Sequence, residues 1–216
     1  MSLILYGASL SPFVRKVRAC LLEKNLDYTM ELVLPQNPPD WYFAINPLGR
    51  IPALRDGALD LCDSAVICAY LDNKYPHTVP LCGTDAEARA RIAWLEKYAD
   101  YEVAPLATFS VFFNRALAKS MGAACDEAAV QTALTKLVKH YDYLEQQLGD
   151  NDYFVGHCLS LADIAVATQW VNLSYAQEVQ DADKWPRLVA HQQRIWARES
   201  FQALFSDEAR MLARLR

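Results

Sequence analysis

The chain has 216 residues, of which 53% are hydrophobic and 22% are charged, and this composition excludes a disordered or fibrous protein. Its formal net charge of −5 argues against binding to nucleic acid or to an anionic lipid surface, which both attract basic proteins. The apolar runs are far shorter than the roughly 20 residues of a membrane span, and the N-terminus lacks a basic, cleavable leader, so we expect a cytoplasmic protein without membrane or nucleic-acid partners.

Residues 1–76 mix short apolar runs with helix-period segments and predict a small α/β sheet domain. Strands are predicted at 3–6, 28–34, 51–54 and 58–61, the last two as a hairpin, with helices from Pro12 and over 64–75. In the first helix the predicted buried stripe is Val14, Val17, Leu21 and Leu22, and the charged residues placed outside it are Arg15, Lys16, Arg18, Glu23 and Lys24. In the second helix the residues predicted to face inward are Val66, Ile67, Tyr70 and Leu71.

Residues 85–216 hold only two prolines and predict an all-helical domain, which follows a linker at 77–84. A helix is indicated by apolar residues that recur at helical spacing, namely Leu134, Leu137, Val138, Tyr141, Leu144 and Leu148. A further helix is predicted to begin after Ser160, with the Asp163 carboxylate reaching back to the Ser160 backbone N–H and flanking apolar residues forming a hydrophobic staple. This signature is structural, and it carries no catalytic role.

The six cysteines include no C-x-x-C pair, and no histidine lies three or four residues from another histidine or a cysteine. A chain of this length buries a core without disulfides, so we expect reduced thiols. The same spacing indicates that there is no metal site.

The first candidate functional segment, Ser9 to Phe13, lies between the first predicted strand and the first helix. Ser11 and Pro12 are residue types preferred at the N-cap and first position of a helix for structural reasons alone. The alternative is that the helix N-terminus and the Ser11 hydroxyl hold a thiolate or an oxyanion.

The second segment, Asn46 to Leu54, places Ile51–Pro52 at the start of a predicted strand, where proline removes a ladder donor. Either this is an edge strand that tolerates proline, or a cis bond turns the Ile51 backbone outward to pair with an extended peptide.

In the third segment, Asp63 and Ser64 precede a helix. Ser64 alone is an ordinary N-cap residue. Together, however, the two residues match the head group of an α-amino acid, because the backbone N–H groups at the helix start could bind its carboxylate and Asp63 could bind its ammonium.

These three segments, in this order, resemble the cytosolic glutathione transferase family, and the resemblance covers essentially the whole chain, including the capping motif at Ser160. It implies a thioredoxin-like N-terminal domain followed by an all-helical domain, and a homodimer. It also implies a transferase that acts in detoxification, with glutathione as co-substrate and without a metal. The glutathione thiolate would attack the second substrate, a small apolar electrophile.

The resemblance implies a role for each matching position. Asp63 and Ser64 would hold the γ-glutamyl group, with Asp63 shorter than the commoner glutamate. Ile51 would pair with the cysteinyl backbone ahead of cis-Pro52, and Arg50, where many relatives carry lysine, would face the glycyl carboxylate. The hydroxyl that activates the thiol in serine-type members, especially those similar to the tau class, falls at Ser11, with Ser9 as a competitor and Tyr6 third.

The second-substrate cleft is expected to be apolar. The side chains able to line it are Leu10, Phe13, Phe109, Phe112 and Phe113, although core packing is the commoner role of each one taken alone. The run from Phe109 to Phe113 places aromatic residues on more than one helix face, so at least one of them should point away from the core.

Two other functions are less consistent with these residues. A non-catalytic interaction protein of the same fold would have no need to retain Ser11, Pro52, Asp63 and Ser64. A glutathione-dependent isomerase of the zeta type carries a Ser-Ser-Cys run at the first helix, which is absent here, and a thiol transferase or dehydroascorbate reductase requires a cysteine where this chain has serine at both positions 9 and 11.

Overall fold

The first part of the chain forms a four-stranded sheet in the order β2-β1-β3-β4, in which β1 and β2 run parallel and β3 is antiparallel to β1 and β4. With its helices, this sheet is the predicted thioredoxin-like arrangement. The computed structural model describes residues 3–215. The elements of this part are β1 (Leu3–Gly7), α1 (Pro12–Glu23), β2 (Tyr28–Leu32), η1 (Asp40–Ala44), β3 (Ala53–Asp56), β4 (Leu59–Cys62) and α2 (Ser64–Lys74).

The strands at the predicted hairpin begin later than expected. β3 starts at Ala53, so Ile51 and Pro52 lie in the loop ahead of it. Pro52 has no N–H to donate, and the ladder therefore begins after it. The turn of the hairpin contains Gly57, whose φ of 63° lies in the left-handed region that favours glycine.

The remainder of the chain is helical, as predicted. A first long helix runs through α3, η2, α4 and η3 without interruption, and η2 and η3 are π-helical. The elements are α3 (Ala86–Tyr98), η2 (Ala99–Val103), α4 (Ala104–Leu106), η3 (Ala107–Leu117), η4 (Lys119–Met121), α5 (Glu127–Leu148), α6 (Leu161–Tyr175), α7 (Pro186–Trp196) and α8 (Glu199–Leu215). Within the described residues, none of these helices has the length and apolarity that crossing a bilayer requires.

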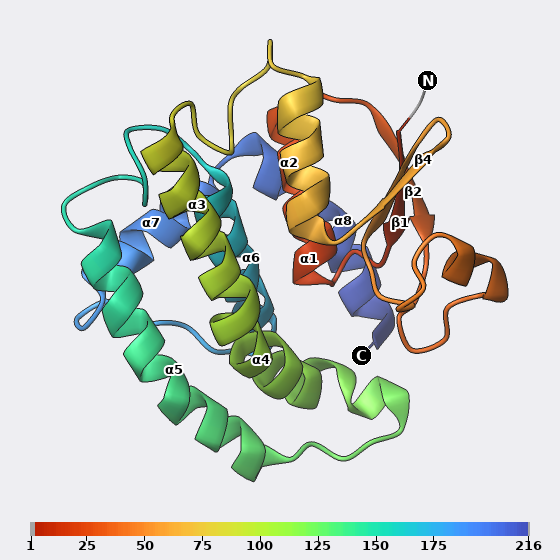
Figure 1. The fold of residues 1–216 in the computed structure, drawn as a ribbon. Coiled ribbons are helices and arrows are strands. Elements are labelled where there is room, and N and C mark those ends of the chain that lie inside the picture. Colours follow the sequence, from red (N-terminus) through yellow and green to blue (C-terminus); the bar gives the residue numbers. More distant parts are fainter. Residues whose placement is uncertain (1–2, 216) are drawn as a thin grey trace.

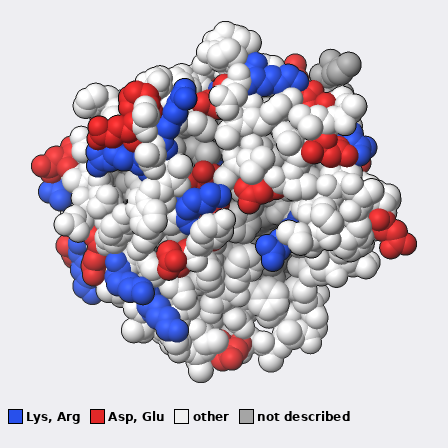
Figure 2. Space-filling model, in the orientation of Figure 1, with Lys and Arg blue, Asp and Glu red and all other residues white. Residues whose placement is uncertain are grey.

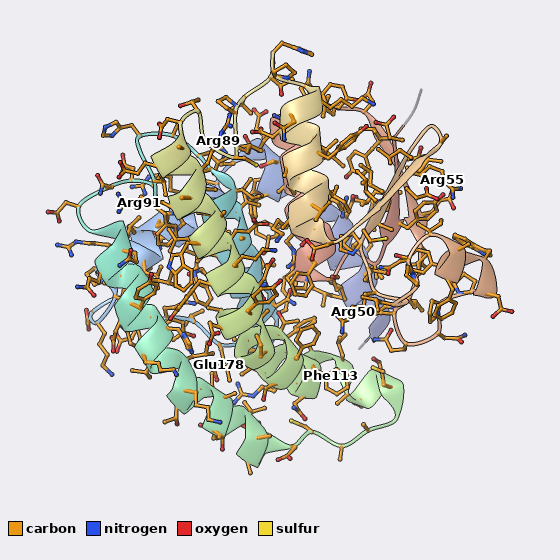
Figure 3. The ribbon with its side chains drawn as sticks, viewed as in Figure 1. Arg50, Arg55, Arg89, Arg91, Phe113 and Glu178 are labelled. Atoms are coloured by element: carbon orange, nitrogen blue, oxygen red, sulfur yellow. The ribbon has the colours of Figure 1, made fainter. Side chains whose placement is uncertain are left out.

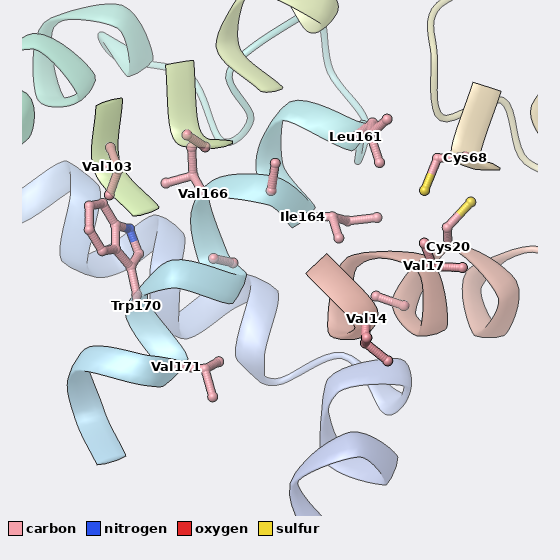
Figure 4. Packing of buried hydrophobic residues seen from close by; sticks show 14 of the residues in the cluster. Val14, Val17, Cys20, Cys68, Val103, Leu161, Ile164, Val166, Trp170 and Val171 are labelled. Carbon is pink, nitrogen blue, oxygen red and sulfur yellow. The ribbon is translucent and has the colours of Figure 1, made fainter. Parts of the chain in front are cut away.

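The two parts share one core. In Figure 1, α1 and α2 lie on the side of the sheet that faces the helical part, whereas η1 lies on the opposite side. Helix α6 is buried from Leu161 to Leu173 and packs against α1, where Figure 4 shows Ile164 facing Val14 and Val17. The predicted cap of α6 is confirmed, because the Ser160 N–H donates to Asp163 Oδ2 at 2.8 Å.

One predicted orientation is wrong. Val66, which is predicted to face inward, is 51% exposed, and Val138 of the apolar series in α5 is likewise 43% exposed. In each helix the neighbouring apolar positions, such as Ile67 in α2 and Leu137 in α5, already face the core. Because successive helical residues point about 100° apart, the next side chain along is carried toward the surface.

The charged residues of α1 lie outside its apolar stripe, but most of them are not at the surface. Arg15, Lys16, Arg18 and Lys24 are buried, and Glu23 is half-buried. Helix α1 is covered on one side by the sheet and on the other by the helical part. The helical part supplies the carboxylates that pair with Arg15, Lys16 and Arg18, whereas Lys24 pairs with Asp72 of α2. The helix is therefore an interior element with two kinds of buried face, one apolar and one ionic.

Candidate functional site

The three candidate segments meet at one end of the sheet. In the strand register, Tyr6 lies opposite Ala53, and Ala53 lies opposite Cys62. The loop after β1, the residues ahead of β3 and the residues after β4 therefore leave the sheet at the same end. Neighbouring strands are about 4.8 Å apart, so the two outer segments are roughly 10 Å apart, which is the reach of three extended residues.

Ser11 is the N-cap of α1, and Pro12 is its first residue, as their positions in the sequence predict. The half-buried Ser11 Oγ accepts a hydrogen bond from the Val14 N–H at 3.4 Å. Its own hydroxyl hydrogen has no acceptor among residues 3–215. The Ser9 hydroxyl, in contrast, donates to Met30 Sδ at 3.9 Å and so points toward β2. The two serine hydroxyls thus differ in their hydrogen bonding, since Ser9 donates within the protein and Ser11, among the described residues, only accepts.

The backbone around Arg50 is fixed by buried side chains. Its carbonyl oxygen accepts hydrogen bonds from Tyr42 Oη at 2.8 Å and from Asn46 Nδ2 at 2.7 Å. Burial raises the pKa of Tyr42 well above its ordinary value, which keeps the phenol protonated as a donor. The Arg50 side chain is exposed, and the following Ile51–Pro52 bond is cis, the second of the two predicted alternatives.

The N-cap of α2 is Asp63 rather than the predicted Ser64. Asp63 Oδ1 accepts hydrogen bonds from Ala65 N at 2.9 Å and from Val66 N at 3.2 Å. Ser64 is the first helical residue and is buried. Asp63 adopts a φ of 73° and a ψ of 127°, a positive-φ conformation that residues with a side chain rarely adopt. The exposed carboxylate keeps its second oxygen, Oδ2, without a donor in the described part of the chain.

The predicted apolar side chains lie in different environments. Phe13 of α1 stacks on Phe109 of η3, with ring centroids 6.2 Å apart and planes inclined by 29°. Phe109 is 61% exposed, so at least one aromatic of the run points away from the core, as its spacing predicts. Phe112 and Leu10 are buried, and the half-buried Phe113 appears in Figure 3 on the long helix.

Tyr6, the third candidate hydroxyl, belongs to the core of the sheet domain. It is 2% exposed, and its ring packs edge-on against Trp41 and Tyr42. Burial raises the pKa of Tyr6 above its ordinary value. Leu5 precedes it in β1, so the two side chains point to opposite faces of the sheet.

Sequence reasoning missed the buried ions of α1. Arg15 forms a bidentate pair with Glu208 of α8, at 2.8 and 2.9 Å. Lys16 Nζ lies 2.9 Å from Glu96 Oε1 and 2.6 Å from Asp100 Oδ2. These partners are at least 80 residues away along the chain, so no local pattern identifies them.

The Lys16 cluster holds two carboxylates and one cation. Burial raises the pKa of both Glu96 and Asp100 above their ordinary values, although Lys16 opposes this effect. Burial alone would lower the pKa of Lys16, but the two carboxylates outweigh it and raise that pKa instead. One oxygen of Asp100 is buried without a hydrogen-bond partner. The cluster therefore links α1 to the long helix through a buried cation.

Other surface features lie apart from the three segments. A hollow of about 240 Å³ lies between α2 and α3, bordered by Asp72, Arg89 and Glu96 among others. On the face shown in Figure 2, basic and acidic side chains are interspersed. Within residues 3–215, no group of three or more histidine, cysteine or acidic side chains is arranged to hold a metal ion.

Comparison with known proteins gives consistent matches. The sequence model of the glutathione S-transferase N-terminal domain matches residues 5–79, and that of the C-terminal domain matches residues 98–199. Glutathione S-transferase F10 of Arabidopsis thaliana is 32% identical over 170 residues, which cover 76% of this chain and 78% of that protein. Glutathione S-transferase 3 of Zea mays is 34% identical over 163 residues, which cover 74% and 72%.

A solved structure agrees in fold over nearly the full length. The crystal structure of a glutathione S-transferase from Rhodospirillum rubrum F11 superposes with a TM-score of 0.84 at 28% identity, covering 94% of this chain and 91% of that one.

Proposed function

This chain belongs to the glutathione S-transferase family, and on that premise we propose that it conjugates the glutathione thiolate to small apolar electrophiles. We further propose that it does so in detoxification, as a cytoplasmic homodimer. The observation that carries the proposal is the convergence of the three segments at one end of the sheet, over a distance that an extended tripeptide spans.

Each part of glutathione has a chemically matched group in this arrangement. The free Oδ2 of Asp63 suits the γ-glutamyl ammonium, and the N-terminus of α2 at Ser64 suits its carboxylate. The backbone of Ile51, ahead of Pro52, suits main-chain pairing with the cysteinyl residue. The exposed Arg50 suits the glycyl carboxylate, since a guanidinium binds such a group through two parallel hydrogen bonds.

Activation of the thiol requires only a modest pKa shift. A free thiol with a pKa of about 8.5 is about 3% ionised at pH 7, and lowering that pKa by about two units requires about 2.7 kcal/mol. A hydrogen bond from the Ser11 hydroxyl to the charged sulfur contributes about 1.5–3 kcal/mol, and the N-terminus of α1 adds about 0.3–1 kcal/mol. These two contributions suffice without a metal or a separate base.

The state of the two hydroxyls favours Ser11 over Ser9. The Ser11 oxygen accepts from the backbone of α1 and keeps its hydrogen for a ligand, whereas the Ser9 hydrogen is directed at Met30. The second substrate would lie against Phe13 and Phe109, with Phe113 and Leu10 nearby in the same two segments. Aromatic rings in such a stack offer a flat apolar surface to an aryl or alkyl group.

The homodimer is supported by exposed apolar side chains. Val66 of α2, Trp94 of α3 and Tyr101 of η2 are 51%, 57% and 63% exposed. Large apolar side chains left in water on adjoining elements are typical of surfaces that bind another protein. A homodimer whose interface covers α2, α3 and η2 would bury all three side chains.

The Ser11 role is tested by comparing Ser11→Ala with Ser9→Ala in conjugation of glutathione to an aryl halide. Loss of a hydrogen bond worth about 1.5–3 kcal/mol corresponds to a turnover about 10- to 150-fold lower for Ser11→Ala, with Ser9→Ala close to wild type. Equal turnover of wild type and Ser11→Ala would remove Ser11 from the mechanism.

The Asp63 role is tested by two substitutions. Asp63→Asn keeps an acceptor for the cap of α2 but removes the charge, so we expect a higher KM for glutathione with little change in turnover at saturation. Asp63→Ala also removes the cap, at an additional cost of about 1 kcal/mol in stability. An unchanged KM in both variants would exclude Asp63 from the site. Absence of glutathione binding in a calorimetric titration of the wild type would favour the non-catalytic interaction protein instead.

A further inference from the structure

A buried chain of polar side chains links α1, α6 and η3 behind the candidate site. Arg15 Nη1 donates to Asn172 Oδ1 at 2.8 Å and to the Thr168 carbonyl at 2.9 Å. Asn172 Nδ2 donates to Thr108 Oγ1 at 3.1 Å, and the same hydroxyl donates to Gln169 Oε1 at 2.7 Å. Arg15, Thr108, Gln169 and Asn172 are 0%, 6%, 1% and 0% exposed.

The two ends of this chain reach the two halves of the proposed site. At one end, the Arg15 backbone N–H donates to the Ser11 carbonyl at 2.9 Å, so Arg15 belongs to the turn of α1 that Ser11 caps. At the other end, Thr108 directly precedes Phe109, which stacks on Phe13. The junction between α1 and η3 thus has a buried polar layer and an aromatic pair, in which Phe109 is exposed and Phe13 is half-buried.

Stability alone does not call for these polar groups. A buried polar side chain costs free energy unless its hydrogen bonds are made, and apolar residues of similar volume often give equal or greater stability. The benefit of a buried network lies in fixing one arrangement of the elements that it joins. Such fixing matters for η3, whose backbone is π-helical over Ala107–Leu117, a rare conformation often associated with functional sites.

We propose that Thr108 and Asn172 are positioning residues that fix the aromatic wall carrying Phe109 relative to the turn of α1 carrying Ser11. They thereby set the affinity of the enzyme for the apolar part of its ligand. The inference rests on the proposed conjugation of glutathione and deepens it. Glutathione itself contacts the sheet domain in that proposal, so its own affinity does not depend on the network.

The test compares Thr108→Val with Thr168→Val. Valine has nearly the shape of threonine, and Thr168 is 1% exposed, but its hydroxyl bonds only to Ala165 O within α6, while its carbonyl would still accept from Arg15. Calorimetry measures two ligands on each protein, glutathione and S-hexylglutathione, which carries an apolar chain on the sulfur. We expect Thr108→Val to weaken S-hexylglutathione about tenfold, or about 1.4 kcal/mol, with glutathione unchanged, and Thr168→Val to change neither.

Two further variants separate positioning from general destabilisation. Thr108→Ser keeps the hydroxyl and should restore the wild-type affinity for S-hexylglutathione. In a Phe109→Ala background, Thr108→Val should have no further effect, because the wall that it positions is gone. If Thr108→Val does not fold, Gln169→Met removes the other partner of the same hydroxyl and should give the same selective loss.

The kinetic signature is equally specific. Thr108→Val should raise the KM for the electrophile and leave the KM for glutathione and the turnover at saturation unchanged. Equal weakening of both ligands, no weakening of either, or the same effect from Thr168→Val would overturn the inference while the proposed function stands. Failure of the wild type to bind glutathione would overturn the proposed function, and the inference with it.

Discussion

The ion pair between Arg15 and Glu208 allows a stability prediction at the junction of the two parts of the chain. Both side chains are 0% exposed, and the two hydrogen bonds between them measure 2.8 and 2.9 Å. Tyr175 Oη also donates to Glu208 Oε2 at 2.7 Å. Glu208→Gln keeps the shape of the side chain, removes its charge, and turns one acceptor into an amide group that faces the guanidinium donors.

The expected cost is large because Arg15 would remain charged and buried. Removing one partner of a buried ion pair costs about 3–5 kcal/mol. For a chain of this size, each kcal/mol shifts the thermal midpoint by about 2–4 °C. We therefore expect Glu208→Gln to lower Tm by roughly 6–20 °C.

An exposed ion pair provides the control. Arg187 lies 2.8 Å from Asp150, and the two side chains are 51% and 92% exposed. Pairs exposed on both sides contribute about 0–1 kcal/mol, so Asp150→Asn should cost little. Urea and thermal unfolding of the two variants at pH 7 give the comparison. Equal costs, or a cost below about 1 kcal/mol for Glu208→Gln, would refute the argument that α8 is held to α1 through a desolvated pair.

Three further predictions concern the rest of the molecule. Asp163→Ala removes the acceptor shared by four buried groups, namely the N–H groups of Phe154 and Ser160, the Ser160 hydroxyl and His191 Nε2. The free energy of unfolding should fall by about 3 kcal/mol or more. A loss below about 1 kcal/mol in urea unfolding would contradict this. Burial raises the pKa of Asp100 and Glu96, so these two groups bind more protons in the folded than in the unfolded state just above the ordinary carboxyl pKa of about 4, and their contribution to stability falls as pH rises through that window. Asp100→Asn removes part of this contribution, so its free energy of unfolding, relative to that of wild type, should increase with pH across the window; a constant difference would show that Asp100 does not titrate there. Val66→Asp should convert the proposed dimer to a monomer in light scattering, whereas Thr132→Asp at an exposed position of α5 should not, and an identical mass for both variants would place the interface elsewhere.

The features that the sequence predicts correctly depend on neighbouring residues. Ser11 with Pro12, and Ser160 with Asp163, start their helices as predicted because a cap is formed within one helical turn. The hairpin at Gly57 depends on a similarly short segment. The three candidate segments are recognised from their residues and their order along the chain. Their convergence in space follows from the strand register, which places all three at the same end of the sheet.

The features that the sequence does not predict depend on distant partners or on local geometry. Arg15 and Lys16 look like surface residues of an amphipathic helix, because nothing near them in sequence indicates that α1 is covered on both sides. Asp63 and Ser64 are both favoured at an N-cap, and Asp63 takes that position because its carboxylate accepts the N–H groups of Ala65 and Val66. Residue type alone therefore distinguishes neither a buried cation from an exposed one nor Asp63 from Ser64 as the N-cap.

The pKa of the glutathione thiol in its complex with the protein tests the central proposal most directly. It is obtained from the ultraviolet absorbance of the thiolate as a function of pH, in wild type and in Ser11→Ala. We predict a value of about 6.5 in the wild type, about two units below that of a free thiol, and a return most of the way toward 8.5 in Ser11→Ala. A bound thiol that titrates like free glutathione in the wild type would contradict the account.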